Sequence, residues 1–85
     1  MDLDVLRLAL LAVCSPEPAL VHRIHGELEH WLNRSLATSD IEAALAELEA
    51  RGLVDADRAA TEVTFVTTES GRELVAERWE EFFPA

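Results

Sequence analysis

The sequence predicts a mainly α (α+β) fold, with its elements in the order α-α-α-β-β-α. Three segments repeat apolar residues every three or four positions, which is the spacing of one face of a helix. Two short strand candidates, 53–57 and 62–67, precede the last predicted helix, and the second of them is rich in β-branched residues. The chain has 85 residues, of which 49% are apolar and 28% are charged, a composition typical of one globular domain spanning residues 1–85.

The first predicted helix covers residues 3–14 and is apolar on almost every side, which predicts a central position in the core. This apolar run does not fit a signal peptide, because the chain starts with the acidic letters MDLD. Pro16 and Pro18 end it far short of a membrane span. The single cysteine, Cys14, suits a buried residue in a reducing compartment. We therefore expect a cytoplasmic protein.

The second predicted helix, 18–32, starts at Pro18, a residue favoured at the first helical position. After a short turn comes the third helix, where Ser39 and Glu42 have the S-x-x-E spacing of a capping box. Gly52 is expected to end the third helix in a left-handed conformation. The apolar stripe of the second helix consists of Val21, Ile24, Leu28 and Trp31 or Leu32, and that of the third consists of Ile41, Ala44, Leu45 and Leu48.

Two predicted strands, Leu53–Asp57 and Glu62–Thr67, follow the third helix and are joined around a hairpin tip with the sequence DRAAT. The final predicted helix begins with Thr68 and Glu69 and ends near Phe83. Its apolar face consists of Leu74, Val75, Trp79, Phe82 and Phe83.

Two passages resemble the winged helix-turn-helix domain of PadR-type transcriptional regulators. ALAELEARGLV, 44–54, is similar to the family's A-L-x-x-L-E-x-x-G-L-[IV] at the end of the recognition helix. FVTTESGRELV, 65–75, is similar to its aromatic-x-L-T-x-x-G-x-x-L passage from the wing into the last helix. MarR-like regulators are a less close match. In two positions the chain departs from the family pattern: Glu42 stands where a Tyr is usual, and Thr67 stands where a Leu is expected.

The resemblance covers nearly the whole chain and implies a winged helix-turn-helix fold. In such a fold the third helix reads DNA, and in these regulators the first and last helices form a homodimer. The charge of the chain disagrees with DNA binding: seventeen acidic residues face seven arginines, no lysine is present, and the formal net charge is −10. A protein of this sign repels the phosphate backbone. Solubility or a salty cytoplasm would explain the acidity equally well.

The outward positions of the third helix carry none of the Arg, Lys, Asn or Gln side chains that pair bidentately with guanine or adenine. Ser39 can bond a base or a phosphate, and Ala43 can contact a thymine methyl group. Arg34 in the turn, Arg51 at the helix end and Arg58 near the wing tip are the expected phosphate contacts. These five DNA-contact candidates predict binding that is weak or needs help from a partner.

The same face supports a second interpretation. Asp40, Glu42 and Glu47 form a predicted acidic interaction face that would dock a basic protein partner or mimic nucleic acid. The winged-helix scaffold would then serve protein interaction and would not read DNA, because a fold does not fix a function.

The terminal helices supply a candidate dimer interface, because three of the five aromatic residues lie within five positions near the C-terminus. A large exposed aromatic patch is uncommon on a monomer, and a purely intrachain core is the alternative use of these residues. The interface candidates are Leu6, Leu10, Val75, Trp79, Phe82 and Phe83.

Metal binding and catalysis receive little support from the sequence. His22 and His25, with Glu29, have a spacing that places ligands on one helical face, but a closed site needs a fourth ligand, and surface histidines are the favoured interpretation. The sequence shows no Ser/His/Asp spacing, glycine-rich phosphate loop or paired-carboxylate motif. We expect no cofactor, no metal ion, no enzymatic activity and no membrane partner.

Overall fold

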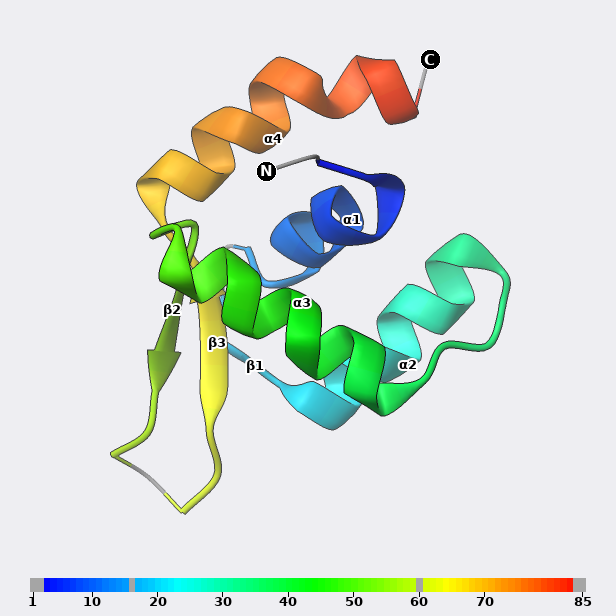
Figure 1. Ribbon diagram of the computed structural model, residues 1–85. Helices are drawn as coiled ribbons and strands as arrows, with labels where there is room; N and C mark the ends of the chain where they lie inside the picture. Colours follow the sequence, from blue (N-terminus) through cyan, green and yellow to red (C-terminus); the bar gives the residue numbers. More distant parts are fainter. Residues whose placement is uncertain (1–2, 16, 60, 84–85) are drawn as a thin grey trace.

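The computed structural model describes residues 3–15, 17–59 and 61–83, and it has the predicted winged helix-turn-helix fold (Figure 1). Its elements are α1 (Val5–Val13), β1 (Ala19–Leu20), α2 (Val21–Leu32), α3 (Thr38–Ala50), β2 (Val54–Asp57), β3 (Thr64–Thr67) and α4 (Glu69–Phe82). Helix α4 crosses α1, helix α3 lies across the front of the body, and the β2–β3 hairpin projects from it as the wing. Among the described helices, none combines the length and the apolar character needed to cross a bilayer.

A short strand, β1, is the main departure from the predicted order, which becomes α-β-α-α-β-β-α. It pairs antiparallel with β3, so the sheet has the order β1-β3-β2, with Ala19 opposite Phe65 and Leu20 opposite Thr64. The prediction that the second helix starts at Pro18 was therefore wrong, and α2 begins at Val21. Ala19 is buried against the core while the backbone of Leu20 is extended. A strand of two residues has no alternating pattern for sequence analysis to detect.

The two longer strands form the wing. Antiparallel pairing places Val54 opposite Thr67 and Asp57 opposite Thr64. Along β2, Val54 is buried while its neighbour Asp55 is exposed, which is the alternation of a sheet with one buried face. The pairing aligns the end of β2, and therefore Arg58 directly after it, alongside the start of β3.

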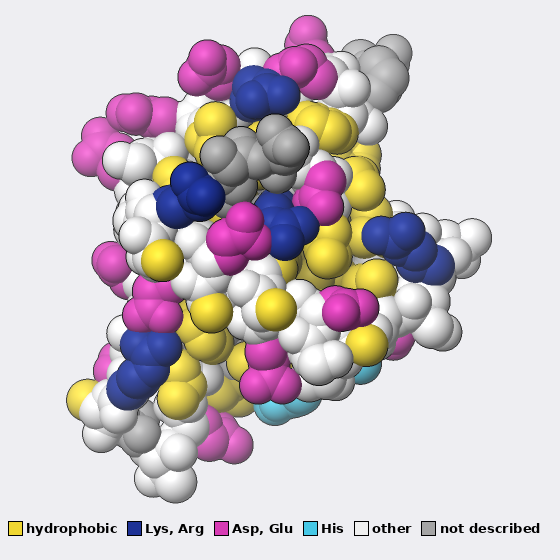
Figure 2. Space-filling model, viewed as in Figure 1, with side chains coloured by type: hydrophobic (Ala, Val, Ile, Leu, Met, Phe, Trp, Pro, Cys, Tyr) yellow, Lys and Arg dark blue, Asp and Glu magenta, His cyan; other side chains and the backbone are white. Residues whose placement is uncertain are grey.

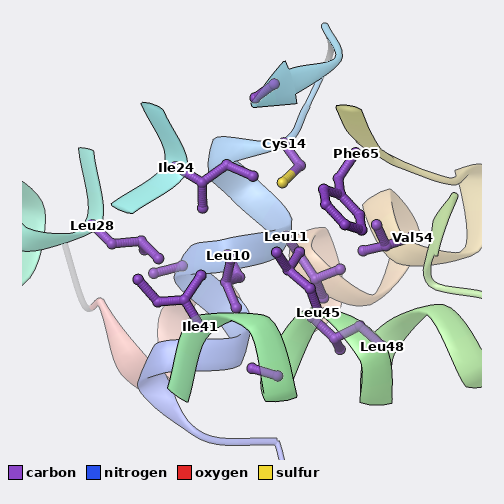
Figure 3. Packing of buried hydrophobic residues seen from close by; sticks show 13 residues of the cluster. Leu10, Leu11, Cys14, Ile24, Leu28, Ile41, Leu45, Leu48, Val54 and Phe65 are labelled. Carbon is purple, nitrogen blue, oxygen red and sulfur yellow. The ribbon is translucent and has the colours of Figure 1, made fainter. Parts of the chain in front are cut away.

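The hydrophobic core lies between α1, α2, α3 and the sheet (Figure 3). Leu10 and Leu11 of α1 meet Ile41 and Leu45 of α3 there, which confirms the predicted central position of the first helix. Each of these four side chains is at most 1% exposed. The buried cluster consists of Ala9, Leu10, Leu11, Cys14, Ala19, Ile24, Leu28, Ile41, Ala44, Leu45, Leu48, Val54 and Phe65.

The turn from α3 into β2 ends the helix as predicted. Gly52 has φ +73°, a left-handed conformation that disfavours a side chain. The amide of Gly52 donates to the Glu49 carbonyl at 3.0 Å, and the amide of Leu53 donates to the Leu48 carbonyl at 3.0 Å. These two hydrogen bonds make a Schellman motif and fix where the wing leaves α3.

The junction between the wing and α4 is held by threonines. The Thr68 hydroxyl accepts from the amide of Gly71 at 3.1 Å, which caps α4, and donates to the Gly52 carbonyl at 2.7 Å. Thr67, at the position where a Leu was expected, is 1% exposed, and its hydroxyl donates to the Leu11 carbonyl at 2.5 Å. This buried hydroxyl is therefore satisfied, and it ties β3 to α1.

Candidate nucleic-acid interface

Helix α3 is the candidate recognition helix and lies beside the wing (Figure 1). Its predicted apolar stripe is confirmed, since the four residues of the stripe are at most 1% exposed. The opposite face of the helix is open to solvent and carries small or acidic side chains. Its exposed residues are Thr38, Ser39, Asp40, Glu42, Ala43, Ala46 and Ala50.

The predicted capping box at the start of this helix is wrong. Helix α3 begins at Thr38, with Ala37 as its N-cap, and no side chain caps its first turn. Ser39 therefore lies inside the helix and not before it. The Ala37 carbonyl accepts the amides of Asp40 and Ile41 at 3.1 and 3.3 Å, so the first turn closes through the backbone. Side chains of α2 bind the turn directly before this helix start.

Two side chains of α2 hold the turn that precedes α3, and we name this contact the Leu36 clamp. The carboxylate of Glu29 accepts from the Leu36 amide at 2.8 Å. The Nε2 atom of His25, one helical turn earlier, lies 2.7 Å from the Leu36 carbonyl oxygen and 3.3 Å from the Glu29 carboxylate. Both main-chain polar groups of Leu36 are thus bound by α2 side chains. Asn33, at the end of α2, takes a left-handed conformation with φ 53° that starts the turn.

In the sequence, His25 and Glu29 stand at a spacing that places metal ligands on one helical face. Within residues 3–15, 17–59 and 61–83, no group of three or more His, Cys, Asp or Glu side chains is placed to hold a metal ion. The i,i+4 spacing of His25 and Glu29 indicated that the two side chains share a face. It did not indicate that the turn eleven residues after His25 would be their partner.

Ion pairs reduce the negative charge that α3 presents. Glu47, predicted on the exposed acidic face, is turned toward α1, where it accepts from the guanidinium of Arg7 at 2.7 and 2.9 Å. This hydrogen bond is the main reason why the pKa of Arg7 is raised. Glu49 accepts from Arg58 of the wing at 2.7 and 2.8 Å, and this pairing lowers the pKa of Glu49. Of the three residues predicted for the exposed acidic face, Asp40 and Glu42 are exposed and Glu47 is half-buried.

Two arginines flank α3 and are exposed. Arg34 lies in the turn before the helix, and Arg51 is its C-cap residue. No ion pair in the described part of the chain includes either of them. Three other arginines have partners away from α3: Arg23 pairs with Glu27, Arg78 pairs with Glu81, and Arg72 donates to the Thr67 carbonyl.

The charge pattern of this face is mixed. In Figure 2, basic side chains lie apart from one another, with acidic and apolar side chains between them. A surface of this kind has no continuous positive stripe, which separates it from strongly binding nucleic-acid proteins. Any attraction for phosphates has to come from individual arginines.

The candidate dimer surface contains an aromatic cluster, of which the sequence indicated the C-terminal residues but not Trp31. Trp79 and Phe83 of the C-terminal segment stack at 4.4 Å between ring centroids, and Trp31 of α2 lies 5.6 and 6.0 Å from them. Trp31 is 50% exposed, so Leu32 is the residue that continues the core stripe of α2. A hollow of about 550 Å³ lies next to this cluster between α1 and α4, and it is lined in part by Val75 and Trp79.

One interface candidate has to be withdrawn. Leu10 is 0% exposed and belongs to the core cluster, so it is not available to a second chain. The sequence did not determine which side of α1 faces the core, because this helix is apolar on almost every side. The other candidates are partly exposed: Leu6, Val75, Trp79, Phe82 and Phe83.

Comparisons with known proteins place the fold. No protein-family profile and no curated protein matches the chain. Among solved structures, RosR of H. salinarum is similar with a TM-score of 0.84 and 22% identity, over 94% of this chain and 74% of that one. A transcriptional regulator from Clostridium thermocellum, Cth-833, is similar with a TM-score of 0.79 and 14% identity, over 89% of this chain and 78% of that one.

A third similar structure contains DNA. It is Lactococcus lactis ZitR in complex with DNA, with a TM-score of 0.74 and 17% identity, over 93% of this chain. The chain spans 52% of the length of ZitR. Likeness at these identities concerns the backbone and not the chemistry of the surface. The chain therefore has the winged helix-turn-helix fold, in common with proteins that include a transcriptional regulator and a protein solved on DNA.

Proposed function

We propose that the protein is a small PadR-like transcriptional regulator that binds duplex DNA weakly as a homodimer. The observation that carries this proposal is the arrangement around α3, an exposed helix face flanked by the exposed arginines Arg34 and Arg51. In a winged-helix fold this helix enters the major groove, and flanking basic side chains reach the phosphates beside it. The DNA complex of ZitR, a protein of similar fold, supports this use of the scaffold.

The exposed face of α3 suits modest base recognition. Ala43 and Ala46 offer small apolar surfaces to thymine methyl groups, Ser39 offers a hydroxyl, and Glu42 can accept from the N4 amino group of cytosine. Bidentate contacts to guanine or adenine, worth about 1–3 kcal/mol each, are not available from these side chains. Phosphate contacts therefore carry most of the affinity. The pairing of Glu47 with Arg7 supports the proposal, since it lowers the repulsion between α3 and DNA.

A homodimer doubles the set of phosphate contacts, which compensates in part for a net charge of −10 per chain. The partly exposed apolar residues on the terminal helices supply the proposed interface: Leu6, Val75, Trp79, Phe82 and Phe83. Two recognition helices related by a two-fold axis would read half-sites about one helical turn apart.

A mobility-shift titration with a mixed-sequence duplex library tests the proposal. At low ionic strength the protein should retain duplex DNA, and Arg34→Ala or Arg51→Ala should each weaken retention about three- to tenfold and make the salt dependence shallower by about one counterion. Arg23→Ala is the matched control, because it removes the same charge from α2, where Arg23 pairs with Glu27. If no duplex is retained at low ionic strength, or if all three variants behave alike, the proposal fails.

The exposed acids Asp40 and Glu42 favour one alternative, a protein-interaction module that docks a basic partner. A charge reversal, Asp40→Arg with Glu42→Arg, separates the two functions. It should tighten binding of a DNA-reading helix to duplex DNA, because two repulsive charges become attractive. It should abolish capture of a basic partner if the acidic face is the docking surface.

A further inference from the structure

The wing and the recognition helix are joined by a bidentate ion pair. Arg58 directly follows β2, and Glu49 lies in the last turn of α3. The Nη1 and Nη2 atoms of Arg58 donate to the two carboxylate oxygens of Glu49 at 2.7 and 2.8 Å. Basic and acidic side chains lie together where the wing meets α3 (Figure 2). Of the three arginines predicted to bind phosphate, Arg58 is thus the one already occupied by an acid.

The pair lines a hollow of about 300 Å³ between α3 and the wing. The apolar side of this hollow is formed by Val21, Val63 and Phe65, and Glu42 and Ala46 of the exposed α3 face also line it. The Arg58 side chain is 58% exposed and that of Glu49 is 32% exposed. The guanidinium is therefore held against the helix that is proposed to enter the groove, while solvent or a ligand can still reach it.

A phosphate and a carboxylate use the same donors of a guanidinium. Both accept a fork of two parallel N–H bonds, so one pair of Arg58 donors cannot serve Glu49 and a DNA phosphate in the same bidentate geometry. Binding of Arg58 to a phosphate would also leave the Glu49 carboxylate without its partner and close to the negatively charged backbone. Both effects oppose DNA binding through the wing.

We infer that Glu49 is an affinity-setting residue that holds the wing arginine in an intramolecular contact and thereby lowers the affinity of the α3–wing surface for duplex DNA. This inference rests on the proposed DNA-binding function. Arg58 can bind a phosphate only by giving up its ion pair with Glu49, whereas Arg34 and Arg51 can bind one without losing an ion pair.

The variant Glu49→Gln tests the inference, because the amide keeps the size of the side chain and removes the charge that competes with phosphate. Exposed ion pairs are weak, so we expect a moderate effect, about three- to fivefold tighter binding to duplex DNA at low salt. The salt dependence should become steeper by about one counterion, as Arg58 joins the phosphate contacts. Glu77→Gln, at an exposed position on α4, is the matched control with the same change in net charge, and it should leave the affinity unchanged.

A double-mutant cycle separates the restraint from simple charge repulsion. In the Arg58→Ala background, Glu49→Gln should have little or no effect if its gain comes from releasing Arg58. A gain that persists without Arg58 would overturn the inference, as would equal effects of Glu49→Gln and Glu77→Gln.

Failure of this inference is distinguishable from failure of the proposed function. If the wild-type protein and Glu49→Gln both leave duplex DNA unbound at low salt, the DNA-binding function itself is wrong. If the wild type binds through Arg34 and Arg51 and Glu49→Gln does not tighten binding, the function stands and the inference about Glu49 is wrong.

Discussion

At the scale of single residues, Cys14 gives the protein an unusual alkaline titration. Burial in the core raises the pKa of its thiol to about 12, with the charge of Glu27 acting in the same direction. The chain contains no lysine and no tyrosine. Cys14 is therefore the only side chain whose ordinary pKa lies between that of histidine and that of arginine. The pH dependence of stability on the alkaline side therefore reports on one residue.

We expect the free energy of unfolding to fall as the pH rises from about 9 toward about 12. The thiol stays protonated in the folded state but ionises in the unfolded chain, so ionisation favours unfolding by up to about 1.4 kcal/mol per pH unit in this window. Urea denaturation at a series of pH values measures this free energy of unfolding. Cys14→Ala lowers stability at every pH but should lack the alkaline decline; an equal decline in this variant would contradict the prediction.

The sequence could predict which residues of a helix are buried, but not which distant residues they meet. The apolar stripes indicated which α3 residues are buried, because spacing alone determines the face of a helix. The partner of Glu47 could not be predicted, since Arg7 lies forty positions earlier and the two meet only when α1 packs on α3. The same reason explains the misassigned Leu10: an all-apolar helix does not indicate which side faces its neighbours.

At the scale of elements, the fold order was predictable wherever an element was long enough to repeat its pattern. Strand β1 has two residues and forms because β3 offers a free edge to Ala19 and Leu20. The S-x-x-E motif at Ser39 was a local signal that the structure does not use: α3 begins at Thr38, directly after the turn that the Leu36 clamp holds. Local rules for helix starts give way where a tertiary contact fixes the turn.

The Leu36 clamp leads to a prediction about the turn that sets the position of α3. Glu29→Ala removes the acceptor of the half-buried Leu36 amide, and we expect a loss of about 1 kcal/mol in the free energy of unfolding. Glu29→Gln keeps an acceptor oxygen and should retain most of that stability. Hydrogen exchange of the Leu36 amide, followed by NMR, should accelerate strongly in the alanine variant and only slightly in the glutamine variant.

Glu27→Ala is the control for this experiment, because Glu27 is also on α2 but pairs with Arg23 on the surface. It should leave the exchange of the Leu36 amide unchanged. If Glu29→Ala also leaves that amide protected, the turn is held by other contacts and the clamp has no role in placing α3.

At the scale of the whole molecule, charge and assembly are linked. Each chain carries a net charge of −10, so two chains repel each other at low ionic strength, and salt screens this repulsion. The phosphate contacts proposed for Arg34 and Arg51 would respond in the opposite direction and weaken as salt is added. A dimeric DNA binder of this composition should therefore bind DNA most tightly at intermediate ionic strength when its concentration is close to the dissociation constant of the dimer.

The dimer itself can be tested at Phe82, which is partly exposed on α4 and lies outside the core and its packed surroundings, so its replacement should spare the fold. Light scattering of the wild type should give twice the 9.4 kDa chain mass at high concentration, with a dissociation constant that falls as salt rises from about 10 to 150 mM. Phe82→Glu should give a folded monomer, because a desolvated carboxylate strongly opposes an apolar interface.

Ala50→Glu is the matched control for that variant, since it introduces the same charge at an exposed residue of α3 that is outside the proposed interface. It should remain a dimer, and circular dichroism should show both variants to be folded. A wild-type mass of one chain at all concentrations and salts would rule out the terminal-helix dimer. Equal dissociation of Phe82→Glu and Ala50→Glu would show that general repulsion, and not a contact at Phe82, controls assembly. The cluster of Trp31, Trp79 and Phe83 would then serve only to pack α4 against α2 within one chain.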